Sequence, residues 1–284
     1  MITFFGVFAF TTVLLLGIIG GFLPLLVYKC VTPSRIDSFT AKANLFAGGV
    51  FLSAAFVHLL PDAFEELTEL TENAPFNVSG VILFFSFLFI MILDQSTHGS
   101  AHGHKDKVEI DIEEEHSHND LLLTTKGEAS NSGILLAVLL SVHSLFAGLS
   151  LGLTSDTGAY AILIAIYAHK GTAAFSLGIA LDPFTTSRKT YSRIILAFSA
   201  CTPVGIALGI FLKTLFEEYT TVVTWFSGVG SIIACATFLY VGIIELIMPY
   251  YKKKISAAKS GFYIVLGGIV MIIVAILESV YGDE

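Results

Sequence analysis

The chain has 284 residues, of which 55% are hydrophobic and only 13% are charged, and its formal net charge is −8 at pH 7. A soluble domain carries about 25% charged residues, so this chain has about half the charge needed to cover a water-facing surface. The composition also excludes a disordered protein, and the negative net charge gives no basis for binding nucleic acid. It predicts an all-α, multi-pass integral membrane protein whose environment is the lipid bilayer.

Eight apolar stretches are long enough to cross a membrane, since a spanning helix needs about 20 mostly apolar residues. We expect them to form a bundle of eight transmembrane helices in a single domain over residues 1–284. A polar, His-rich loop over residues 98–132, expected to be flexible and to face inward, joins the third helix to the fourth. The predicted spans cover residues 1–28, 43–61, 73–93, 129–155, 157–181, 194–212, 219–248 and 260–277.

The basic residues predict the orientation of this bundle. Among the Lys and Arg residues, only Lys213 lies in a connection that follows an even-numbered span, and Lys170 lies inside a span. Because cytosolic loops are enriched in Lys and Arg, both termini are expected on the non-cytosolic side. The other basic residues all lie in the connections that follow the odd-numbered spans: Lys29, Arg35, Lys42, Lys105, Lys107, Lys126, Arg188, Lys189, Arg193, Lys252, Lys253, Lys254 and Lys259.

A few titratable residues interrupt the apolar spans. A charge at the middle of a membrane helix costs roughly 2.5–3.5 kcal/mol on insertion scales, so a residue kept there is a candidate for function. These candidates are His58, His143, His169, Lys170 and Glu245, with Asp62 at the outer end of the second span.

Each of these residues also has a purely structural interpretation. A single intramembrane His, such as His58, is often a hydrogen-bonded core residue, and Glu245 could simply form an ion pair with Lys170. His143 and His169 differ because they lie on neighbouring spans, each followed by small residues that let helices approach closely. Imidazole nitrogen is a good ligand for Zn²⁺, so the two His predict a metal site at mid-membrane.

Five motifs lie in order along the chain, on the second, fourth, fifth, sixth and seventh predicted spans. They read HLLPDA at residues 58–63, HSLFAG at 143–148, HKGTAAFSLG at 169–178, TPVGIALG at 202–209 and TFLYVGIIE at 237–245. With these motifs the chain resembles the ZIP (zinc- and iron-regulated transporter-like) family of divalent-metal transporters. The resemblance covers the whole set of spans and the His-bearing loop after the third.

The resemblance implies an eight-helix bundle with both termini outside and a metal site within the membrane. It makes His143 and His169 metal ligands, with Ser144 as a further candidate. Lys170 would fill the place that a second metal occupies in relatives with an acidic residue there, and Glu245 would pair with Lys170 or lie beside the site. The implied substrate is Zn²⁺, with other divalent metals open, and no organic cofactor is expected.

The entrance and the inner loop carry further candidate ligands. His58 and Asp62 are candidate metal ligands on the second span, and the connection after it is acidic, which would concentrate cations by a nonspecific field. Five of the eight His residues fall in the polar loop, where they could contact a metal after transport. These loop residues are His98, His102, His104, His116 and His118.

One position departs from the family pattern and leaves two interpretations open. The family has Glu four residues after the first His, one helical turn away, whereas this chain has Ala147. Ala173 holds the corresponding place after His169. The first interpretation is a metal transporter, driven without ATP because no phosphate-binding loop motif is present. The second is a ZIP-like protein that has lost transport and serves as a subunit of a membrane complex. A homo-oligomer fits either interpretation, and neither is an enzyme.

Overall fold

The computed structural model describes residues 2–102, 131–154, 157–181, 186–215, 220–251 and 256–281, and their regular structure is helical. Two of the helical segments, η1 and η3, are π-helices. In chain order the elements are α1 Ile2–Cys30, α2 Pro33–Ser53, η1 Ala54–Leu59, α3 Leu60–Leu70, α4 Val78–His102, α5 Asn131–Leu153, α6 Thr157–Ala180, α7 Arg188–Leu215, α8 Thr220–Tyr240, η3 Val241–Ile247 and α9 Ala257–Tyr281.

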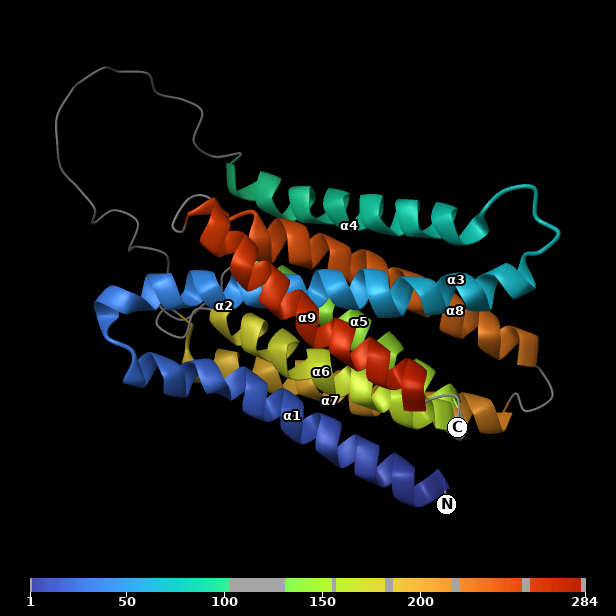
Figure 1. Cartoon of the computed structure of the whole chain (residues 1–284). Helices are drawn as coiled ribbons and strands as arrows, with labels where there is room; N and C mark the ends of the chain where they lie inside the picture. Colours follow the sequence, from blue (N-terminus) through green and yellow to red (C-terminus); the bar gives the residue numbers. More distant parts are fainter. Residues whose placement is uncertain are drawn as a thin grey trace.

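The described helices include 8 that are long and apolar enough to cross a membrane, which confirms the predicted number of spans. The chain is therefore a multi-pass integral membrane protein. One crossing runs without a break through α2, η1 and α3, and another runs through α8 and η3. The start of α1 and the end of α9 lie at the same end of the bundle as α3 (Figure 1). We call this the terminal end, and the opposite one, where α1 connects to α2, the connecting end.

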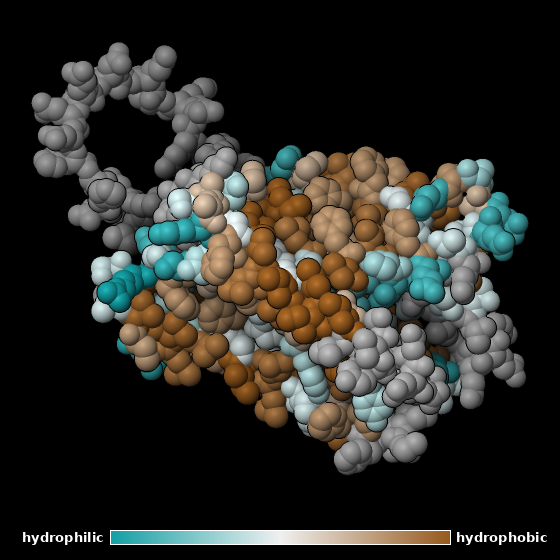
Figure 2. Space-filling model, viewed as in Figure 1, coloured by the Kyte–Doolittle hydropathy of each residue, from teal (hydrophilic) through white to brown (hydrophobic). Residues whose placement is uncertain are grey.

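The outer surface of the bundle suits a lipid environment. Figure 2 shows apolar residues across the middle of the visible face and hydrophilic residues gathered toward its two ends. On α4 the side chains of Phe84, Phe85 and Phe89 are each more than 60% exposed. Exposed aromatic residues on this scale are rare on soluble monomers but expected where a helix faces lipid.

The helices pack as two groups (Figure 1). In the first group α1, α5, α6 and α7 make their most extensive contacts with one another, and in the second the α2–η1–α3 crossing, α4, α8–η3 and α9 do so. Hydrogen bonds hold each group together. Tyr191 on α7 donates to the Gly21 carbonyl on α1 at 2.6 Å, and Tyr240 on α8 donates to Asp94 on α4 at 2.5 Å. The broadest contact between the two groups is that of α5 with α8.

Glycines bring the backbones of neighbouring helices into contact within each group. A Cβ atom at Gly148 on α5 would lie 2.1 Å from the Thr202 carbonyl oxygen on α7. In the second group, a Cβ atom at Gly49 on α2 would lie 2.0 Å from the Ile264 carbonyl oxygen on α9. Because lipid provides no hydrophobic drive for helices to associate, such close packing supplies much of the cohesion.

We expect the Gly148→Ala variant to be clearly less stable than the parent chain. The new methyl group would overlap the α7 backbone, and overpacking of this kind costs about 1–3 kcal/mol. Gly261→Ala is the matched control, because no atom lies within 4 Å of a Cβ atom at Gly261. Thermal unfolding of the detergent-solubilised proteins measures both. Equal midpoints for the two variants would contradict the described α5–α7 contact.

The helices differ in extent from the apolar stretches of the sequence. The second crossing begins at Pro33 and continues to Leu70, beyond residues 43–61, and α7 begins at Arg188 rather than at residue 194. Also, α4 extends to His102, into the stretch expected to be a loop. Polar residues at helix ends reach past the hydrocarbon core into the interface, so an apolar run underestimates helix length.

Candidate metal site

Two imidazoles of the first helix group meet where that group faces the second. The Nε2 atoms of His143 on α5 and His169 on α6 are 3.4 Å apart, and the two side chains are only 2% and 3% exposed. Zinc binds imidazole nitrogen at 2.0–2.1 Å in tetrahedral geometry, which places two such ligands about 3.3–3.4 Å from each other. The pair therefore has the separation of two ligands that share one zinc ion.

A fully buried aromatic ring covers this pair from the second helix group. The ring of Phe238 on α8 lies with its centroid 3.7 Å from that of His143 and 5.3 Å from that of His169. On its other side it stacks on Phe51 of α2, with centroids 4.6 Å apart and an interplanar angle of 1°. The ring restricts the orientation of both imidazoles and places an apolar layer beside them.

Lys170 extends its ammonium group into a cage of oxygen atoms within the first group. Its Nζ atom donates to Ser144 Oγ and Thr202 Oγ1, each at 3.0 Å, and to the Phe198 carbonyl at 3.4 Å. It also lies 3.9 Å from the centroid of the Phe198 ring. These three acceptors use all three donors of the ammonium group. The lysine thus links α5, α6 and α7 beside the His pair, and its hydrogen bonds within the described residues go to two hydroxyl oxygens and one carbonyl oxygen.

We expect Lys170→Met to lower the zinc concentration for half-maximal uptake by at least about ten-fold, because it removes a positive charge beside the bound cation. Replacing a buried charge by an apolar side chain of similar size is commonly neutral for stability. Lys213→Met, at the far end of α7, makes the same charge change away from the pair and is expected to leave uptake unchanged. Identical zinc dependence in both variants would contradict a role for the Lys170 charge.

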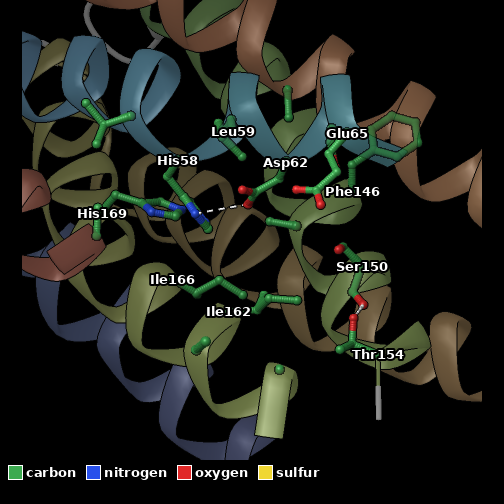
Figure 3. Close-up of a pocket in the computed structure, with 17 residues that line it drawn as sticks. His58, Leu59, Asp62, Glu65, Phe146, Ser150, Thr154, Ile162, Ile166 and His169 are labelled. Atoms are coloured by element: carbon green, nitrogen blue, oxygen red, sulfur yellow. Dashed lines mark hydrogen bonds and ion pairs between the residues drawn. The ribbon is translucent and has the colours of Figure 1, made fainter. Parts of the chain in front are cut away.

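A cavity of about 680 Å³ leads from His169 toward the terminal end of the bundle. Its lining includes His169, His58, Asp62, Glu65 and Ala147, and Figure 3 shows the labelled side chains around it. His58 Nδ1 and Asp62 Oδ2 are 3.2 Å apart, the interaction dashed in Figure 3. This space, which we call the first cavity, gives water and ions a way to His169.

The candidate ligands predicted from the sequence lie at two different places in the structure. His143 and His169 come together, and His58, which pairs with Asp62, lies beside His169 in the first cavity (Figure 3). Ser144 accepts a hydrogen bond from Lys170. Glu245 lies elsewhere, in a second cavity of about 470 Å³.

The two placements considered for Glu245, in an ion pair with Lys170 or among the ligands beside the His pair, are therefore not found. Glu245 lies seven residues, about two helical turns, beyond Phe238 on the same crossing, which puts it nearer the connecting end than the His pair.

Only two protein ligands converge at the site in the part of the chain that is described. No three His, Cys, Asp or Glu side chains among those residues come close enough to hold one metal ion. Water would have to complete the coordination of a zinc ion between His143 and His169. Of the loop residues, His98 and His102 belong to α4 with side chains that are not described, and His104, His116 and His118 lie outside the described residues.

Some residues of the site were not identified from the sequence. Phe238 belongs to the motif at 237–245 and Thr202 to the motif at 202–209, but neither motif indicates a contact with the His pair or with Lys170. Asn44 is a polar residue within the apolar second span, so the sequence alone could have indicated it. The structure places it in the second cavity.

Comparison with known proteins identifies the family. A sequence profile described as "ZIP Zinc transporter" matches residues 4–275, almost the whole chain. The chain belongs to this family. It is 30% identical over 255 residues to "Zinc transporter 11" of Arabidopsis thaliana, with 85% of this chain and 77% of that protein covered. Zinc transporter ZIP1 of Takifugu rubripes is 30% identical over 264 residues, with coverage of 84% and 86%.

The family also includes a relative named for another metal. "Fe(2+) transport protein 1" of Arabidopsis thaliana is 33% identical over 221 residues, with 71% of this chain and 63% of that protein covered. Membership confirms the resemblance that the five motifs indicated and makes the chain a ZIP-family metal transporter rather than an enzyme.

Proposed function

We propose that this ZIP-family chain carries zinc across the membrane toward the cytosol and that His143 and His169 hold the ion midway. The observation that supports this most is the 3.4 Å separation of the two buried Nε2 atoms, which matches two ligands of one zinc ion. Imidazole also suits Fe²⁺, so iron is the second candidate substrate, favoured by the relative named for iron.

The two cavities supply the route. The first cavity faces the terminal end, which the distribution of Lys and Arg assigns to the non-cytosolic side. Asp62 and Glu65 line it, and carboxylates in a cleft raise the local concentration of cations. The second cavity lies at the connecting end, where Tyr28 and Asp37 are among its lining residues. Zinc would enter by the first cavity, bind the His pair and leave by the second.

The Phe51–Phe238 stack lies between the two cavities. On the second crossing His58 lines the first cavity and Asn44 lines the second, and Phe51 is seven residues from each. Phe51 therefore lies about midway between His58 and Asn44 along this crossing. The stack belongs to the second helix group and the His pair to the first. A shift of one group relative to the other would move the bound ion past this apolar layer.

Weak binding suits a transported ion, which must leave as well as enter. Two neutral imidazoles leave the charge of the dication uncompensated, and the ammonium group of Lys170 next to the pair repels it. Both effects favour short occupancy of the site over tight retention.

Zinc uptake into proteoliposomes with a trapped fluorescent indicator tests this function, with protein-free vesicles as the reference. We expect saturable uptake that requires the protein. A folded protein that gives no uptake of zinc or iron would instead support the ZIP-like subunit without transport, for which Ala147 is the main argument.

A further inference from the structure

The charges of the first helix group are unbalanced. In the described part of the chain, its helices α1, α5, α6 and α7 contain no Asp or Glu residue. Their basic residues include Lys170, which is buried inside the group, and Lys213, at the terminal end. The others lie at the connecting end and form what we call the basic surface: Lys29 on α1 and Arg188, Lys189 and Arg193 on α7.

No described residue neutralises the basic surface. Its four side chains are exposed, and none of them makes a hydrogen bond or an ion pair with another described residue. The second group differs, because carboxylates such as Asp37 and Asp94 lie toward its connecting end. The charge of the basic surface therefore has to be balanced by an anion from outside the described helices.

The packing of α1 on α7 sets the depth of these charges in the membrane. The two helices lie side by side and run antiparallel (Figure 1). A Cβ atom at Gly17 would lie 2.9 Å from Ser199 Oγ, and one at Gly6 would lie 3.3 Å from Ile210 Cδ1. The two contacts are eleven residues apart on both helices, so one register holds over this length.

The same register brings an arginine beside exposed apolar side chains. It places Lys29 at the level of the first residues of α7 and Arg193 at the level of Leu23. Six residues separate these two levels, so Arg193 lies about 9 Å nearer the middle of the bilayer than Lys29. Around it, Leu23 and Leu26 on α1 and Leu196 on α7 are 41%, 59% and 48% exposed. The side chain of Arg193 thus leaves its helix where the surface faces lipid tails.

An anionic phospholipid has both of the features that this surface requires. Its phosphate group offers paired oxygen acceptors to the guanidinium group of Arg193. Its acyl chains cover exposed leucines, which a water-soluble anion does not. The distribution of Lys and Arg assigns the connecting end to the cytosolic side, where anionic lipids attract basic residues beside membrane helices.

We propose that the basic surface binds an anionic phospholipid of the leaflet at the connecting end. Lys189 and Arg193 are four residues apart on one face of α7, where they hold the phosphate group. Lys29 and Arg188 add positive charge at the level of the headgroup, and Leu196 contacts an acyl chain. Because the basic surface belongs to the helix group that carries the His pair, the lipid attaches that group to one leaflet.

The thermal unfolding midpoint of the full-length protein in a neutral detergent tests this site. We expect phosphatidylglycerol to raise the midpoint by at least about 3 °C, because it binds the folded protein. Phosphatidylcholine with the same acyl chains, and inorganic phosphate without lipid, should leave the midpoint unchanged. The Lys189→Gln/Arg193→Gln variant is expected to lose the rise. The Lys189→Arg/Arg193→Lys variant, which keeps both charges, should retain it.

Arg35→Gln/Lys259→Gln is the matched control, because it removes two exposed basic residues at the connecting end of the second group. It should keep the rise that phosphatidylglycerol gives. An equal rise in Lys189→Gln/Arg193→Gln, or no rise in the parent chain, would refute the lipid site. A rise with inorganic phosphate alone would also refute it, since the surface would then bind a soluble anion. The measurement needs no zinc, so its result is independent of the proposed function.

Discussion

His143→Ala is expected to abolish saturable zinc uptake, with a residual rate at least about 100-fold below that of the parent chain. The site has only two converging protein ligands among the described residues, so removing one leaves a single imidazole. Initial rates in proteoliposomes at equal protein content measure the loss.

His58→Ala is the matched control for this prediction. It removes an imidazole that lines the first cavity and pairs with Asp62, but not one of the 3.4 Å pair. We expect it to raise the zinc concentration needed for half-maximal uptake while the maximal rate stays measurable. Full zinc uptake in His143→Ala, or an equal loss of uptake in the two variants, would contradict the proposal that the pair binds the transported ion.

Ala147→Glu is expected to increase zinc affinity by at least about ten-fold. Ala147 lies one helical turn after His143 and lines the first cavity together with His169. A carboxylate here would supply the third protein ligand usual for zinc in an open site and would offset the charge of Lys170. We expect the maximal rate of zinc uptake to fall as the affinity for zinc rises, because a more tightly bound ion leaves more slowly.

Ser150→Glu distinguishes a new ligand from a mere change of charge. Ser150 lines the same cavity but is seven residues from His143, about one turn farther along α5 than Ala147. It adds the same charge without reaching the pair. Zinc binding to the purified variants, measured by calorimetry, should tighten strongly in Ala147→Glu and little in Ser150→Glu. Equal changes would indicate that the carboxylate acts only through the field of the cavity.

The spans and the central pair could be predicted because their signals are local. Each span is a run of apolar residues, and a charge within such a run stands out on its cost alone. His143 and His169 were also supported by their similar surroundings on two neighbouring spans, and the structure brings them together.

The rest of the site could not be predicted from the sequence, because it depends on how each crossing is rotated about its own axis relative to its neighbours. Glu245 lies on the same crossing as Phe238, but the π-helical turn of η3 directs it to the second cavity while Phe238 covers the His pair. Nothing in the apolar pattern marks such a turn. Lys170 is similar: its position suggested a carboxylate partner, whereas two hydroxyls and a carbonyl receive its hydrogen bonds.

Zinc K-edge X-ray absorption on the purified chain tests most directly whether the His pair binds the transported ion. The parent for this experiment carries Asn at the five loop His residues, so that the remaining imidazoles are intramembrane, and it receives less than one equivalent of zinc. We predict imidazole scattering in the parent and its loss in the His143→Ala/His169→Ala variant. A spectrum that is the same in both proteins would contradict the assignment of the ion to this pair.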